Sequence, residues 1–187
     1  STLFRSSAAS DVYKRQLEGV LHSAFVRSPF SRAKINSIDI SKAEKLDGVF
    51  AVYTCENIGD LDIELPLLIP HPSMKDGRTQ RPLARDHVYY VGQTIAMVVA
   101  KDRYIAEDAC LLIEVDYEPM EVEIDIEQAI KNEAPLVHDT HPNNIAADFT
   151  QVCGEPEKFM EKAEHVTKIR VQVERSTSAA MECRTVA

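Results

Sequence analysis

The sequence predicts an α+β fold in which helices pack on one side of a mixed sheet. Three neighbouring observations support this class. Residues 94–100 are a continuous apolar run, as expected of a strand that is covered on both faces. Residues 103–113 carry apolar side chains at helical spacing, and Asp102 can cap the helix that they form. Val115 and Tyr117 then alternate with acidic residues, which is typical of a half-exposed strand.

Short elements are expected before this region. The predicted strands are residues 20–26, a segment that carries Ile35, Ile38 and Ile40, and residues 49–54. Ser41 and Glu44 have the spacing of a capping box, so a helix of one or two turns should begin there. Gly48 suits the left-handed conformation that ends such a helix. Residues 59–82, which contain several prolines and glycines, predict a long loop of the kind that is often functional.

Further elements are expected after the central helix. Residues 122–126 alternate between apolar and acidic side chains and predict a second acidic strand. A short helix is expected at residues 127–131, and Pro156 should be the first residue of a helix that reaches Ala163. The remaining predicted strands are residues 166–173 and 179–187.

Four parts are predicted along the chain. Residues 1–16 lack periodicity and resemble a translated sequencing adapter, so they are predicted to be a non-native or disordered segment. The main domain is expected to span residues 17–133, and residues 134–151, rich in Asn, Pro and Asp, are predicted to be a linker. Residues 152–187 are expected to be the incomplete start of a second domain. The chain is therefore expected to be a fragment at both ends.

Charge and cysteine usage disfavour several classes of protein. The formal net charge of −9 argues against a nucleic-acid partner, which requires a positive face. The four cysteines lie far apart without a C-x-x-C pair, so zinc-ribbon and iron–sulfur signatures are missing and a reducing compartment is favoured. No apolar run approaches the roughly 20 residues needed to cross a bilayer. A cytoplasmic location is predicted.

Few residues are candidates for chemistry. His138 and His141, with Asp139 between them, could hold a metal ion. Pro142 opposes the helix that would align the two rings, so histidines that cap turns in a loop are the favoured interpretation. Cys153 lies in a predicted loop and is a weak candidate for a nucleophile, because thiolate activation is not visible in a sequence.

Most charged residues are interpreted as surface groups. The carboxylates between Glu114 and Asp125 alternate along predicted strands, which favours a solvated face. Arg27, Arg81 and Arg85 flank the long loop, where contact with a neighbouring domain or subunit is favoured over contact with a cofactor. Glycine-rich nucleotide-binding motifs are missing from the sequence. We therefore assign no catalytic, cofactor-binding or metal-binding residue.

A series of short motifs resembles a known family in order and spacing. These motifs are L-H-S-A-F-V-R-S-P-F-S-R-A-K-I at 21–35, G-V-F-A-V-Y-T at 48–54, R-P-L-A at 81–84, V-Y-Y-V-G-Q-T-I-A-M-V-V-A at 88–100, A-E-D-A at 106–109 and V-D-Y-E-P-M at 115–120. Together they resemble the N-terminal a/b hammerhead domain of the molybdopterin-binding large subunit in the xanthine dehydrogenase, aldehyde oxidase and aerobic carbon monoxide dehydrogenase family. Residues 181–187 resemble a segment often written M-E-P-R-G near the start of the molybdenum-cofactor-binding portion, with Cys183 and Thr185 in place of Pro and Gly.

The resemblance implies an oxidoreductase that hydroxylates or oxidises small substrates with water-derived oxygen. It implies molybdopterin in the complete parent, FAD and [2Fe-2S] clusters on partner subunits or domains, and a dimer of multi-subunit protomers. In relatives the glycine-rich cofactor segment and the general-base glutamate lie downstream of position 187, so this fragment is expected to be an inactive scaffold. The alternative is a stand-alone interaction module that keeps the hammerhead fold without chemistry.

Overall fold

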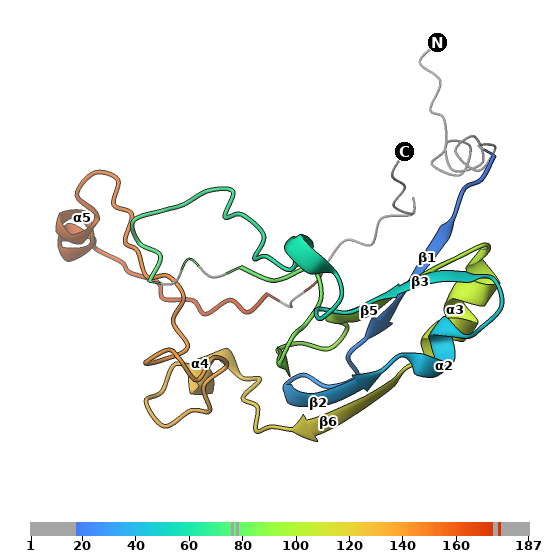
Figure 1. Cartoon of the computed structure of the whole chain (residues 1–187). Helices are drawn as coiled ribbons and strands as arrows, with labels where there is room; N and C mark the ends of the chain where they lie inside the picture. The colour runs from blue at the N-terminus through green and yellow to red at the C-terminus, as the bar shows by residue number, and fades with distance from the viewer. Residues whose placement is uncertain (1–17, 76, 78, 174–175, 177–187) are drawn as a thin grey trace, which may run out of the picture. The chain divides into compact units, whose positions relative to one another are not determined.

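The computed structural model describes residues 18–75, 77, 79–173 and 176 (Figure 1). Residues 21–148 form one compact unit, and the later residues are described separately. Two three-stranded sheets make up the unit. One has the order β1 (His22–Arg27), β5 (Thr94–Ala100), β3 (Val49–Tyr53), and the other β4 (His87–Val88), β2 (Ala33–Asp39), β6 (Glu114–Pro119).

Short helices connect or cover these strands. They are α2 (Ser41–Glu44), the 3-10 turn η1 (Gly59–Leu61), α3 (Arg103–Leu111), α4 (Ile126–Ala129) and α5 (Pro156–Lys162). Helix α3 packs against β1, β3 and β5, and α2 lies beside α3 and β3 (Figure 1). Both therefore cover one sheet. No helix in the described part of the chain is long and apolar enough to span a membrane.

The structure confirms the α+β class, while the expected mixed sheet is found as two sheets in which all described strand pairs are antiparallel. The reason lies in β5. Its two edges are already occupied by β1 and β3, which leaves no edge for the strand that follows α3. That strand, β6, pairs with β2 instead, and α3 carries the chain from one sheet to the other.

Strand β5 supplies both hydrophobic cores. Ala96, Val98 and Ala100 are fully buried against α3, as the continuous apolar run predicts. Ile95 points to the second core, where it packs with buried residues of β2 and β4. The partly buried side chains of Ile38 and Val115 pack against both cores and so connect the two sheets.

Helix α3 begins as predicted. The carboxylate of Asp102 accepts a hydrogen bond from the Ile105 amide at 2.9 Å, which satisfies one of the unpaired amides of the first turn. Ala106 and Ala109 are fully buried against the sheet. Because their side chains are small, the helix axis can lie close to the strands.

The start of α2 differs from the predicted capping box. Ser41 is the first helical residue, and the Asp39 carboxylate accepts the Ser41 amide hydrogen bond at 2.9 Å. This bond lowers the pKa of Asp39, because it stabilises the charged form. In a capping box the Glu44 side chain would accept the hydrogen bond from the Ser41 amide. Here the Asp39 carboxylate accepts it instead, and the Glu44 amide donates to the Ile40 carbonyl at 3.0 Å.

Gly48 has the left-handed conformation that the sequence predicts, with φ of +87°. It lies in the turn that enters β3, and its carbonyl accepts a hydrogen bond from the Lys101 amide at 2.8 Å. A Cβ added here would lie 2.7 Å from Cδ1 of Ile105 on α3. The turn therefore requires glycine for its conformation and for its close approach to α3.

We expect Gly48→Ala to lower the free energy of unfolding by about 1 kcal/mol, since alanine is strained at positive φ and Ile105 must move. Urea denaturation measures this change. Gly77→Ala is the matched control, because its Cβ would meet nothing within 4 Å. Equal midpoints for the two variants would contradict this account of the turn.

Two predicted strands are wrong. Residues 120–125 follow β6 without a strand assignment, and Ile124 is 85% exposed. Ala33, the first residue of β2, pairs with Pro119, the last residue of β6. Beyond this pair, the Met120 amide donates one hydrogen bond to the Arg32 carbonyl, and the residues after Met120 have no neighbouring strand to pair with. The segment predicted as a strand at 166–173 likewise has no strand assignment, and its residues are exposed.

The remaining predictions concern the long loop, two short helices and the last strand. The described residues between 59 and 82 form a long loop as predicted, interrupted by η1. Helix α5 begins at Pro156, as predicted, and all its residues are exposed. The predicted helix at 127–131 is found as α4, which begins one residue earlier and ends two residues earlier, at Ala129. The predicted strand at 179–187 lies outside the described residues.

Candidate functional site

Two long loops of the compact unit are bonded to each other. The first loop comprises residues 59–86, and the second loop comprises residues 120–148. The Lys75 amide donates to the Ala146 carbonyl at 2.9 Å, and Met74 and Ala147 form an antiparallel bridge. The ring of His138 lies 4.3 Å from that of Tyr89, which follows β4. The predicted linker therefore runs along the compact unit up to Asp148 and is bonded to it.

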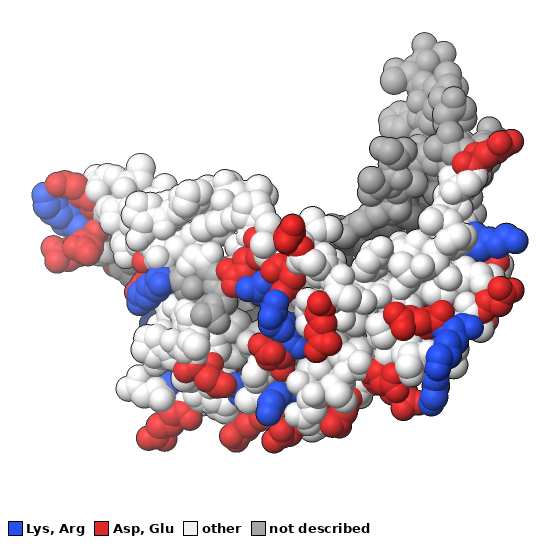
Figure 2. Space-filling view, in the orientation of Figure 1, with Lys and Arg blue, Asp and Glu red and all other residues white. Residues whose placement is uncertain are grey.

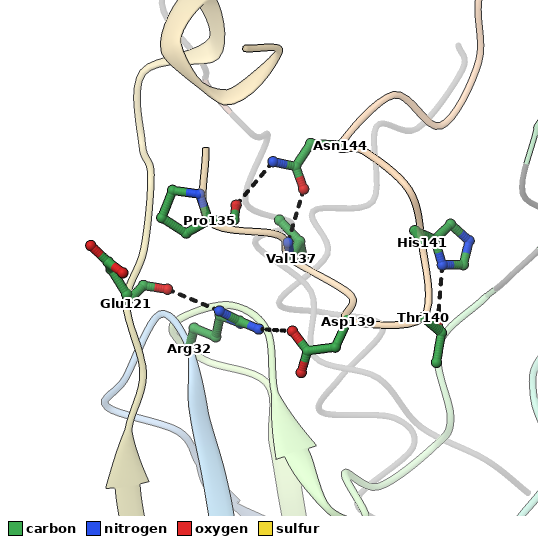
Figure 3. Close-up of polar contacts among 8 residues, drawn as sticks. All are labelled: Arg32, Glu121, Pro135, Val137, Asp139, Thr140, His141 and Asn144. Carbon is green, nitrogen blue, oxygen red and sulfur yellow. Dashed lines mark hydrogen bonds and ion pairs between the residues drawn. The ribbon is translucent and has the colours of Figure 1, made fainter. Parts of the chain in front are cut away.

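Arg32, at the start of β2, holds the second loop (Figure 3). The guanidinium donates from Nη2 to the Asp139 carboxylate at 2.7 Å and from Nη1 to the Glu121 carbonyl at 3.1 Å. The Arg32 side chain is 8% exposed, whereas that of Asp139 is 67% exposed. A buried cation is costly without a partner, so the Asp139 carboxylate is the group that permits Arg32 to be buried.

Asn144 braces the same loop through its side-chain amide (Figure 3). Its Nδ2 donates to the carbonyls of Ala129 at 2.9 Å and Pro135 at 3.0 Å. Its Oδ1 accepts from the Val137 amide at 2.9 Å. One side chain thus satisfies three backbone groups of a segment that has no regular structure, which is how irregular chain is held in one conformation.

The first loop is held by a second charged cluster. The Asp62 side chain is 6% exposed and pairs with Arg85 through Oδ2. Arg81 donates from Nη1 to the Asp62 carbonyl at 2.6 Å, and the same nitrogen lies 3.4 Å from Asp62 Oδ1. Both arginines are therefore engaged within the loop by one buried carboxylate.

A cavity of about 400 Å³ lies between these loops. Its lining includes the charged Arg81 and Arg85 and the aromatic rings of His87, Tyr89 and His138. The volume is in the range of small-molecule pockets, but the two cations are already paired with Asp62. Within the described residues, no three His, Cys, Asp or Glu side chains converge as metal ligands would.

Comparison with known proteins identifies the family. Residues 9–121, more than half of the chain, match the family described as aldehyde oxidase and xanthine dehydrogenase, a/b hammerhead domain. The chain belongs to this family. The match confirms the resemblance carried by the sequence motifs, and it includes residues 9–16 of the segment that the sequence analysis set aside.

The relatives of this hammerhead domain are much longer proteins. The carbon monoxide dehydrogenase large chain of Afipia carboxidovorans is 44% identical over 125 residues, which are 66% of this chain and 15% of that protein. The 6-hydroxypseudooxynicotine dehydrogenase complex subunit gamma of Paenarthrobacter nicotinovorans is 35% identical over 171 residues, 90% of this chain and 21% of that protein. The solved Cu,Mo-CO dehydrogenase has a TM-score of 0.59 and 41% identity, covering 71% of this chain and 16% of its own. The hammerhead chain thus spans about a fifth or less of each.

The predicted candidate residues of the compact unit have different partners. Arg27 donates from Nη1 to the Gly92 carbonyl at 2.9 Å and lies over the Phe25 ring, whereas Arg81 and Arg85 pair with Asp62. The rings of His138 and His141 are 5.8 Å apart. Asp139, between them in sequence, pairs with Arg32. The sequence analysis missed Arg32, and its burial carried no local sequence signal.

The acidic face predicted for the hammerhead domain is confirmed for β6. Glu114, Asp116 and Glu118 are exposed on this strand, and Figure 2 shows acidic side chains distributed over the surface with only scattered basic ones. Glu114 pairs with Lys42 at 2.5 Å, and both side chains are more than half exposed. Such exposed pairs contribute little to stability, so this face serves mainly to keep the strand solvated.

The cysteines of the hammerhead chain differ in burial. Cys55 is buried, Cys110 is partly buried and Cys153 is exposed, while Cys183 lies outside the described residues. Burial raises the pKa of Cys55, which Arg85 partly offsets, and burial followed by the charge of Glu107 raises the pKa of Cys110. Both thiols are therefore less ionised at neutral pH than a free cysteine and are poor nucleophiles.

We expect iodoacetamide at pH 8 to alkylate Cys153 at least about tenfold faster than Cys55, because only exposed thiolates react. Peptide mass spectrometry over time measures each site in the folded chain. In urea the two rates should become similar. Rapid labelling of Cys55 under native conditions would show that its surroundings open readily.

Proposed function

We propose that this chain is the N-terminal part of the molybdenum-binding large subunit of an oxidoreductase that hydroxylates or oxidises small substrates. The observation that carries the proposal is the extent of the similarity. It reaches beyond the hammerhead match to 171 residues of a dehydrogenase complex subunit, yet covers only 21% of that protein. A solved relative is a Cu,Mo-CO dehydrogenase.

Within such a subunit the described residues would serve as a scaffold. The two arginines of the cavity share the Asp62 carboxylate, Arg32 is engaged by Asp139, and the two cysteines of the compact unit are buried or partly buried. These are groups that hold loops in place. None is left with the convergent, unpaired arrangement that a catalytic site requires. We therefore propose that the chain alone has no activity.

The described residues do not fit the cofactors that the family implies. Molybdopterin is anionic, and the cavity offers it two cations that are already paired, with Glu64 and Asp86 also in the lining. A [2Fe-2S] cluster needs cysteine ligands in one place, whereas Cys55, Cys110 and Cys153 belong to separate segments. We propose that molybdopterin is held by other parts of the parent, and FAD and the clusters by partner subunits or domains in the cytoplasm.

The complete reading frame tests the proposal. We expect a glycine-rich segment of the G-G-F-G kind within roughly a hundred residues after Ala187, and neighbouring frames for an FAD subunit and a two-cluster iron–sulfur subunit. Purified with those partners, the complete protein should contain about one molybdenum atom per large subunit by elemental analysis. A stop codon soon after Ala187 would instead support the stand-alone hammerhead module.

A further inference from the structure

One segment of the first loop buries a charged side chain and exposes large apolar ones. Residues 61–69, here termed the apolar loop, turn a carboxylate inward and expose large apolar side chains. The Asp62 side chain is 6% exposed, whereas its neighbours Leu61 and Ile63 are 67% and 62% exposed. Leu68 and Ile69 are 89% and 80% exposed. Burying the charge and presenting the apolar groups costs solvation free energy, so this arrangement favours a surface that is covered in the working protein.

The apolar loop is held in place by bonds that do not involve its apolar side chains. Asp62 is fixed by Arg81 and Arg85. The Leu65 amide donates to the Gln80 carbonyl at 3.0 Å, and the Thr79 hydroxyl donates to the Leu65 carbonyl. Residues 62 and 65 of the apolar loop are therefore held in place before binding, which lowers the entropic cost of binding a partner.

The charge of the segment restricts the partner. From Leu65 to Met74 the sequence contains no Asp, Glu, Lys or Arg, although charged residues are 27% of the chain. Within residues 61–69 the charged groups are Asp62, which is buried, and Glu64, which is exposed, so the side chains from Leu65 onward offer no attraction to a strongly acidic or basic face. A partner must therefore supply an apolar face of its own.

The course of the chain indicates which partner lies nearest. Ser73 and Lys75, just beyond the apolar loop, are bonded to Asp148 and Ala146, where the compact unit ends. Polypeptide that continues from the unit, first residues 149–187 and then the rest of the complete subunit, starts beside this loop and is tethered to it, which raises its effective concentration there. The relatives are about five times or more as long as the matched part.

We infer that the apolar loop packs against polypeptide that follows residue 187 in the complete large subunit, joining the hammerhead domain to the cofactor-binding portion. The inference rests on the proposed function, because it needs that continuing polypeptide. It names residues 61–69 as the interface and an apolar surface of the same subunit as the occupant. A second copy of the chain or an FAD or iron–sulfur subunit would be different occupants.

Photo-cross-linking in the assembled enzyme tests which occupant is correct. A benzoylphenylalanine at position 68 should cross-link to a peptide from beyond residue 187 of the same polypeptide. The matched control is position 111 on α3, where the leucine is 84% exposed outside this loop and should not give that product. A product with a second copy or with a partner subunit would overturn the inference, as would the absence of any product.

A pair of stability measurements supplies an independent readout. Leu68→Ser with Ile69→Ser should leave the urea midpoint of the 187-residue chain unchanged, because both side chains are exposed there. The same change should lower the melting temperature of the complete enzyme by roughly 2 °C or more. Equal effects in both proteins would overturn the inference. If the enzyme contains molybdenum but shows neither signal, only the docking surface is wrong; if it contains no molybdenum, the proposed function is wrong.

Discussion

Val98→Asp should lower the free energy of unfolding by about 4 kcal/mol, the largest effect expected of any single change described for this chain. Val98 is fully buried in the central strand β5, between that strand and α3. The change removes the buried valine and places there a carboxylate that has no partner. With a typical urea dependence, the midpoint should fall by about 2 M or the chain should not fold at all.

Urea denaturation followed by circular dichroism measures this loss. Leu111→Asp is the matched control, since Leu111 belongs to the same core-covering helix but is 84% exposed. Its midpoint should lie close to that of the unchanged chain. Val98→Ala, which introduces no charge, should fall between the two. An unchanged midpoint for Val98→Asp would show that β5 is not the centre of the domain.

Asp139→Ala should lower the free energy of unfolding by about 2 kcal/mol and loosen the second loop. The change leaves the buried Arg32 guanidinium without its carboxylate, and hydrogen bonds to charged groups are worth more than neutral ones. Hydrogen exchange should accelerate at the Val137 and His141 amides, which are bonded within this loop. The cavity should lose His138 from its wall in the same variant.

The exposed pair of Lys42 and Glu114 provides the comparison for Asp139. Glu114→Ala removes a carboxylate of similar exposure whose partner is solvated, so its cost should stay within about 0.5 kcal/mol. Arg32→Met added to Asp139→Ala should recover part of the loss, because no buried charge then remains. Equal costs for Asp139→Ala and Glu114→Ala would mean that Arg32 finds other partners when Asp139 is absent.

The fold was predictable where local pattern and tertiary packing agree. The apolar run of β5 and the cap of α3 by Asp102 both have their causes within a few residues, and both are found. Residues 122–126 show the limit of such reasoning. Their alternation describes which side chains would face water in a strand, but a strand forms only where a neighbouring strand offers its backbone. Strand β2 begins at Ala33, which already pairs with Pro119.

The site was less predictable because its contacts join distant residues. Arg32 and Asp139 are 107 positions apart, and neither has a neighbour in sequence that signals the pair. Arg81 and Arg85 were singled out as residues that flank the long loop, for contact with a neighbouring domain or subunit. Their shared partner Asp62 was not, since only the folded loop shows that this carboxylate points inward while Leu61 and Ile63 point outward.

Ile38 and Val115 pack against both hydrophobic cores, so the stability of each sheet depends on the packing of the other. If either sheet loses its packing, apolar surface of the other sheet becomes exposed to water. The hammerhead unit should therefore unfold in a single transition. A destabilising substitution in β2 or β6 would then also lower the stability of β5. In the proposed large subunit, such a unit would therefore be either folded as a whole or unfolded as a whole.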